Sequence, residues 1–153
     1  MPLIPCGKVL DYHSTTMKFS HTLTTTAAPE AIWKQWTDVK YWPVWDTELV
    51  SANLLEDFKL NAKGELKPKT GPESSFVISQ LDPYKSYTFT TQLPFCKLNV
   101  RRYLETNDDD RTTFTHEVSF VGPLAVVFGT LLGRRFRTVL PTVMENLRRL
   151  AET

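Results

Sequence analysis

Residues 124–150, LAVVFGTLLGRRFRTVLPTVMENLRRL, carry a helical pattern of apolar side chains close to the end of the chain. The apolar residues recur at steps of three and four, which places them on one side of an α-helix. The pattern predicts a helix of roughly 25–30 residues. Pro141 lies inside it and removes one backbone donor, so we expect a kink there.

The chain between Thr47 and Val121 has the pattern of successive β-strands. Apolar and polar residues alternate over 60–67, 87–91 and 113–120, the period of a half-buried strand. Turn sequences separate the runs: Lys69-Thr70-Gly71-Pro72, Asp82-Pro83, Leu93-Pro94 and Asn107-Asp108-Asp109-Asp110. These short connections leave no room for crossover helices, so neighbouring strands are expected to be antiparallel.

The first part of the chain adds one more strand and two short helices. Residues 17–24 alternate like a strand, and Pro29 suits the first position of a helix that carries Trp33 and Trp36 on one side. Residues 42–45 are expected to form a second short helix or turn. Because a sheet must cover its apolar face, the long C-terminal helix is expected to lie on it.

The expected architecture is therefore an α+β fold in which a curved antiparallel sheet of about seven strands wraps around the long C-terminal helix. Two short helices lie between strands one and two. We assign residues 17–153 to this single domain and residues 1–16, which have no clean period, to an N-terminal arm.

Composition excludes several classes of function. The chain has 153 residues, 41% hydrophobic and 23% charged, typical of one globular domain. A net charge of +1 indicates no nucleic-acid partner. Two cysteines form neither a disulfide scaffold nor a usual zinc site. We expect no metal and no cofactor, no transmembrane segment, a cytoplasmic location because no targeting signal is recognised, and leave a homodimer open.

Four stretches resemble the START-like or Bet v 1-like (SRPBCC) superfamily, in particular its polyketide cyclase/dehydrase branch. They are residues 25–33 (TTAAPEAIW), 37–46 (TDVKYWPVWD), 115–118 (THEV) and 122–125 (GPLA). The resemblance extends over residues 17–151. It implies a helix-grip fold with a deep cavity between the sheet and the long helix, used for lipids, sterols, polyketides or other apolar molecules. The superfamily has no universal catalytic motif, so we assign no catalytic residue.

Four polar residues share strand faces with apolar side chains and are expected to point inward. They are His21, Tyr87, Arg102 and His116. A buried polar group must find a partner, either in the protein or in a ligand, so these residues are candidates for orienting a ligand. A bulge or a shift of one residue would direct Arg101 inward instead of Arg102.

Two further ligand candidates lie on the long helix. Gly129 either leaves volume for a ligand or lets the helix approach the sheet closely, and the sequence does not decide between the two. Arg135 lies near the apolar stripe of the first half of the helix. The four tryptophans, Trp33, Trp36, Trp42 and Trp45, are expected to be core anchors rather than a ligand cage, and Asp46 is expected to cap a local turn.

Three functions remain open at this stage. The leading hypothesis is binding, or transport, of a small apolar ligand or lipid between the sheet and the long helix. The alternative is an enzyme of the cyclase/aromatase or dehydratase kind that uses His116 or His21 as general acid–base and Arg102 to stabilise an enolate. The third is a chaperone-activating interaction module, which predicts a filled interior and a functional exterior.

Overall fold

The computed structural model describes residues 16–153. The predicted N-terminal arm, residues 1–16, lies outside the described residues except for Thr16, which begins the first strand. Among the described residues, no helix is both long and apolar enough to span a membrane.

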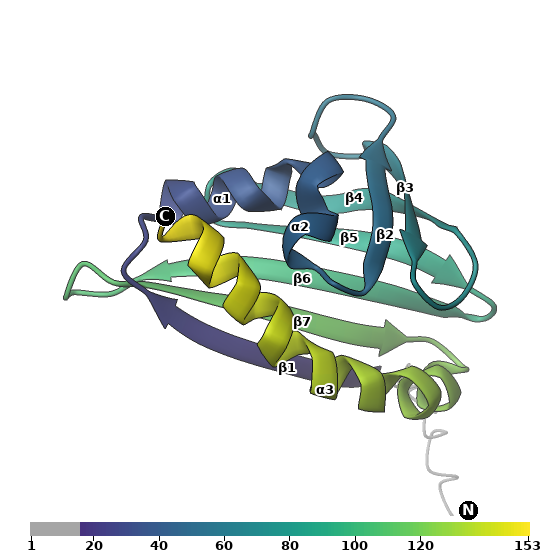
Figure 1. The fold of residues 1–153 in the computed structure, drawn as a ribbon. Helices are drawn as coiled ribbons and strands as arrows, with labels where there is room; N and C mark the ends of the chain where they lie inside the picture. Colours follow the sequence, from purple (N-terminus) through teal and green to yellow (C-terminus); the bar gives the residue numbers. More distant parts are fainter. Residues whose placement is uncertain (1–15) are drawn as a thin grey trace, which may run out of the picture.

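A single antiparallel sheet of seven strands, in the order β1-β7-β6-β5-β4-β3-β2, forms the body of the protein (Figure 1). Its strands are β1 (Thr16–Thr25), β2 (Leu49–Leu54), β3 (Lys63–Pro68), β4 (Ser74–Asp82), β5 (Ser86–Leu93), β6 (Cys96–Thr106) and β7 (Thr112–Val121). β1 pairs with β7, which lies far along the chain, whereas each other pair of neighbouring strands in the described residues is consecutive in sequence. The predicted α+β architecture is confirmed.

Short helices connect β1 to β2, as predicted. They are α1 (Pro29–Thr37), the single 3₁₀ turn η1 (Val39–Tyr41) and α2 (Trp42–Trp45). The long helix α3 (Ala125–Ala151) has 27 residues, within the predicted length. It continues past Pro141, and its two halves in Figure 1 do not lie along one straight line.

Two glycines let the first half of α3 approach β1 closely. A Cβ added at Gly129 would lie 2.6 Å from the Met17 sulfur, and one added at Gly133 would overlap the ring of Phe19. Gly129 therefore leaves no free volume for a ligand, because the Met17 side chain already occupies it. The ligand-volume interpretation of Gly129 is wrong, and close helix–sheet contact is the reason.

The tryptophans are core anchors, as predicted from the sequence. Trp36, Trp42 and Trp45 are fully buried and Trp33 is 8% exposed. The ring of Trp42 packs against those of Phe76 and Phe89 at centroid distances of 5.6 and 5.1 Å. These rings fill the space between the sheet, the short helices and the second half of α3.

We expect Gly133→Ala to lower the free energy of unfolding by about 1–2 kcal/mol, because overpacking against Phe19 outweighs the higher helix propensity of alanine. Thr130→Ala, at an exposed position of the same helix, should raise it by a few tenths of a kcal/mol. Urea denaturation followed by circular dichroism measures both. A stabilised Gly133→Ala variant would show that α3 does not pack on β1 as described.

Candidate functional site

Four of the predicted site residues lie in one row across four neighbouring strands. Tyr87 on β5 pairs with Arg102 on β6, Arg102 pairs with His116 on β7, and His116 pairs with His21 on β1. Because residues paired across a sheet point to the same face, all four side chains lie on the inner surface. The alternation within each strand therefore predicted the inward face of each of the four residues. It could not show that the four residues are neighbours across the sheet.

Arg102 is the most enclosed charged residue of the row. Its side chain is 4% exposed, and Nη1 donates a hydrogen bond to the Tyr87 hydroxyl at 2.5 Å. The guanidinium carbon lies 4.7 Å from the ring centroid of Trp42 and 4.9 Å from that of Trp45. Arg101, the alternative inward residue, is exposed and lies over the ring of Tyr103. Arg102 is thus the inward-pointing arginine.

The guanidinium of Arg102 is incompletely paired. Among residues 16–153, no carboxylate forms an ion pair with it. Its Nε and the indole nitrogen of Trp45 are buried donors with no hydrogen-bond acceptor in the part of the chain that the structure describes. Burial raises the pKa of Asp46, and the charge of Arg102 opposes that rise. The Asp46 carboxyl is therefore close enough to the guanidinium for an electrostatic effect on its pKa, but it forms no ion pair with it.

His116 is held as a neutral acceptor. The indole nitrogen of Trp36 donates to Nε2 of His116 at 3.0 Å, so in a neutral ring the proton resides on Nδ1. Burial lowers the pKa of His116 well below its usual value, and the charge of Arg102 adds to this effect. At neutral pH the imidazole fixes the orientation of Trp36.

Trp36 also connects Tyr87 to α2. Its carbonyl accepts hydrogen bonds from the Tyr87 hydroxyl at 3.3 Å and from the Trp42 indole at 2.9 Å. Burial raises the pKa of the Tyr87 phenol, and Arg102 opposes this. Tyr87 therefore stays protonated at neutral pH and can both donate to Trp36 and accept from Arg102.

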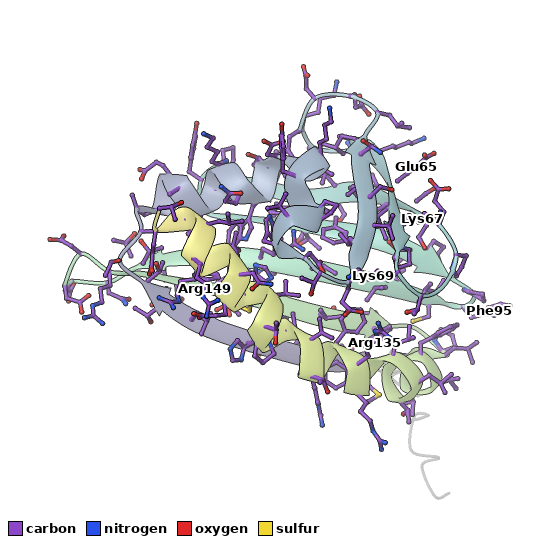
Figure 2. All side chains as sticks on the ribbon, in the orientation of Figure 1. Glu65, Lys67, Lys69, Phe95, Arg135 and Arg149 are labelled. Atoms are coloured by element: carbon purple, nitrogen blue, oxygen red, sulfur yellow. The ribbon has the colours of Figure 1, made fainter. Side chains whose placement is uncertain are left out.

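The remaining predicted residues lie away from the row. Arg135 is exposed on α3 (Figure 2). Its Nε donates to Glu48 at 2.7 Å, which joins α3 to the segment after α2. Gly129 lies beneath the first half of α3 against Met17. Asp46 accepts a hydrogen bond from the backbone nitrogen of Glu48 at 3.1 Å, the local turn expected from the sequence.

Sequence reasoning missed the enclosure of Arg102 by Trp42 and Trp45. The two tryptophans are three residues apart, the spacing at which side chains of one helical turn share a face. This spacing predicts that the two tryptophans lie on one face of the helix. It does not predict that this face contacts Arg102.

Apolar side chains beyond the tryptophans remain partly accessible on the inner face of the sheet. Leu66 on β3, Leu93 on β5 and Leu98 on β6 are half-buried, as are Phe128 and Phe136 on α3. A hollow of about 300 Å³ lies on the outside of the aromatic cluster, lined by Trp33, Thr37, Phe58, Leu81, Pro83 and Tyr84. Among the described residues, no cluster of three or more histidine, cysteine or acidic side chains could hold a metal ion.

Replacing Arg102 by methionine should raise the free energy of unfolding of the unliganded protein by about 1–3 kcal/mol. The substitution removes an incompletely paired buried charge and keeps most of the apolar volume. Urea denaturation measures the change. Arg101→Met, on the opposite face, should change stability by less than about 0.5 kcal/mol. Marked destabilisation by Arg102→Met would contradict the view that the guanidinium lacks a partner.

The folded protein should lose about 1 kcal/mol of stability between about pH 7.5 and about pH 5.5 through His116. Its pKa is lowered on folding from 6.5, so below that pH the unfolded state takes up a proton that the folded state refuses. The contribution is complete above pH 6.5 and is lost as the pH falls. Urea denaturation at both pH values measures the free energy of unfolding. Its change with pH should be smaller for His116→Gln than for the unmodified protein, whereas His21→Gln should retain most of the change.

Comparisons with known proteins identify the fold and the family. No curated protein sequence matches the chain significantly. Among solved structures, norcoclaurine synthase from Thalictrum flavum in complex with dopamine and hydroxybenzaldehyde is similar, with 12% identity, coverage of 99% of this chain and 95% of that one, and a TM-score of 0.68.

Two other structures share the fold at similarly low identity. A Deinococcus radiodurans protein has 13% identity, covers 87% of this chain and 95% of its own, and has a TM-score of 0.65. Ara h 8.0201 has 13% identity, coverage of 87% and 98%, and a TM-score of 0.63. The family model described as polyketide cyclase / dehydrase and lipid transport matches residues 16–152. The superfamily expected from the sequence is confirmed, and the chain belongs to the polyketide cyclase/dehydrase and lipid transport family.

Proposed function

We propose that the protein binds a small hydrophobic molecule that carries a hydrogen-bond acceptor, such as a carboxylate, enolate or carbonyl, between the sheet and α3. Membership of a family described by polyketide cyclisation, dehydration and lipid transport supports a hydrophobic ligand in general. The norcoclaurine synthase structure in complex with dopamine and hydroxybenzaldehyde supports small organic ligands for this fold.

The unpaired capacity of Arg102 is the observation that carries the proposal. Desolvating a guanidinium is unfavourable by several kcal/mol unless acceptors compensate for it. Here the neutral Tyr87 hydroxyl is the one acceptor recorded for it within residues 16–153, and Nε has none. A ligand acceptor at this position would complete the hydrogen bonds of Arg102 and, within reach, those of the Trp45 indole.

The apolar body of the ligand would lie along the inner face of β6. Leu98 and Val100 precede Arg102 on that face, and Leu93 flanks them on β5. Burial of an apolar ligand there contributes about 25 cal/mol per Å² of surface removed from water.

The indoles of Trp42 and Trp45 cover the guanidinium in this structure, so a ligand must displace them from it. Both belong to the four-residue helix α2. The Trp45 carbonyl accepts a hydrogen bond from Asn146 of α3 at 3.3 Å, and Glu48, which follows α2, pairs with Arg135. Arg135 then acts by holding the tryptophan-bearing segment against α3 rather than by contacting the ligand.

An enzyme of the cyclase or dehydratase type is the second candidate, favoured by the direct pairing of Arg102 and His116 across β6 and β7. Its weakness is chemical. Nε2 of His116 already accepts the Trp36 indole proton, so proton transfer at that nitrogen requires the bond to break. Binding without catalysis needs no such step.

The test is fluorescence titration with cis-parinaric acid and with its methyl ester, which has the same chain without the negative charge. The acid should bind at least about tenfold more tightly than the ester, because a charge-assisted hydrogen bond contributes about 1.5–3 kcal/mol. Arg102→Met should abolish this difference, and Arg101→Met, one residue away on the opposite face, should retain it. Tryptophan emission should change on binding as the indoles move.

If Arg102→Met and Arg101→Met preferred the acid over the ester equally, Arg102 would not be the residue that binds the ligand's charged group. Absence of binding to either probe, together with no apolar molecule detected by mass spectrometry in protein purified without delipidation, would refute ligand binding. The interaction-module hypothesis would then be preferred, since the aromatic packing around Trp36 agrees with a filled interior.

A further inference from the structure

Five large hydrophobic side chains are exposed in the β5–β6 turn and the first eight residues of α3. They are Phe95, Val126, Val127, Leu131 and Leu132, with exposed fractions of 76, 50, 49, 70 and 38%. We call these five residues the α3 apolar patch. The backbone nitrogen of Leu124 donates to the Phe95 carbonyl at 3.2 Å, which joins the turn to α3. Figure 2 labels Phe95 at the tip of this turn, on the side of the molecule where α3 begins.

Two features of Phe95 are energetically unfavourable: its ring is exposed and its backbone is strained. A phenyl ring in water forgoes hydrophobic burial, and Phe95 has a φ of 51°, in the left-handed region that a bulky residue rarely adopts. Glycine or asparagine would suit this turn better. Strain of this kind at an exposed aromatic residue indicates a functional contact.

The two segments that carry the patch contain basic residues and no acidic ones, and Glu48, an acidic side chain that reaches this half of α3, is paired with Arg135. No acidic residue occurs between Val121 and Met144 or between Leu93 and Arg102. Arg134 lies one helical turn from Leu131, and Lys97 follows the turn on the outer face of the sheet; both are exposed. Among the described residues, neither forms an ion pair. The patch is therefore an apolar surface with a positively charged rim.

We propose that the α3 apolar patch docks onto an anionic lipid surface. Phe95 and Leu131 enter the boundary between headgroups and acyl chains, while Arg134 and Lys97 contact anionic headgroups. An apolar layer beneath a negatively charged layer complements an apolar surface rimmed with cations. The proposed contact is peripheral, through the surface of the folded domain.

The same charges argue against a second copy of the chain as the occupant. A two-fold dimer through this patch would bring the Arg134 and Lys97 side chains of both copies to one interface. Like charges repel across a contact that excludes water. An anionic lipid surface has no such conflict.

Vesicle co-sedimentation of the full chain, with no parinaric acid present, tests the proposal. The protein should bind vesicles of equal parts phosphatidylcholine and phosphatidylglycerol, and bind phosphatidylcholine vesicles weakly. Leu131→Ser should weaken partitioning about tenfold. Its matched control is Leu55→Ser, which changes a leucine of similar exposure, 67%, located after β2.

Charge is tested separately. Arg134→Gln should weaken partitioning about threefold to fivefold, because each basic residue near an anionic surface contributes about 1 kcal/mol, and high salt should remove this difference. Lys67→Gln, over β3 (Figure 2), is the charge-matched control and should have little effect. Circular dichroism checks that each variant folds.

Three results would overturn the proposal. One is equal partitioning of Leu131→Ser and Leu55→Ser, and another is equal binding to both kinds of vesicle. The third is a dimer in light scattering that Leu131→Ser dissociates, which would assign the patch to self-association. Because vesicle binding and probe titration are separate measurements, failure of one leaves the other proposal standing.

Discussion

The buried charge of Arg102 determines which side chains surround it in the interior. The guanidinium lies between Trp42 and Trp45 and donates to Tyr87. Aromatic faces attract a cation, but they accept no conventional hydrogen bond, so they compensate only part of its lost hydration. The enclosure therefore holds Arg102 in place and leaves part of its hydrogen-bonding capacity unused.

The polar groups around Arg102 form a chain of hydrogen bonds. Tyr87 accepts from the arginine and donates to the carbonyl of Trp36, and the indole of Trp36 donates to His116. Each of these hydrogen bonds orients the next group, so the strands and α1 are coupled through side chains as well as through packing. His116 serves this network as a neutral acceptor, since a protonated ring would face the Arg102 charge and lose its bond to Trp36.

The two halves of α3 have different environments. Leu140, Val143, Met144 and Leu147 of the second half are buried in the core that contains Trp36 and Trp45. The first half packs on the edge strand β1 through glycines. A helix that packs by a narrow glycine stripe leaves more of its circumference in solvent, and there the apolar residues of the α3 patch are exposed.

The sequence alone determined the elements and their faces. The alternation on β5, β6 and β7 correctly directed Tyr87, Arg102 and His116 inward, and the steps of three and four marked α3, because both periods follow from local backbone geometry. The strand order and the use of the interior were decided by the tertiary structure. Whether Gly129 left space or allowed contact depended on Met17, more than a hundred residues away in the sequence. Likewise, the enclosure of Arg102 by tryptophans from α2 and the contact between the Phe95 backbone and the start of α3 depend on long-range packing, which local periodicity does not encode.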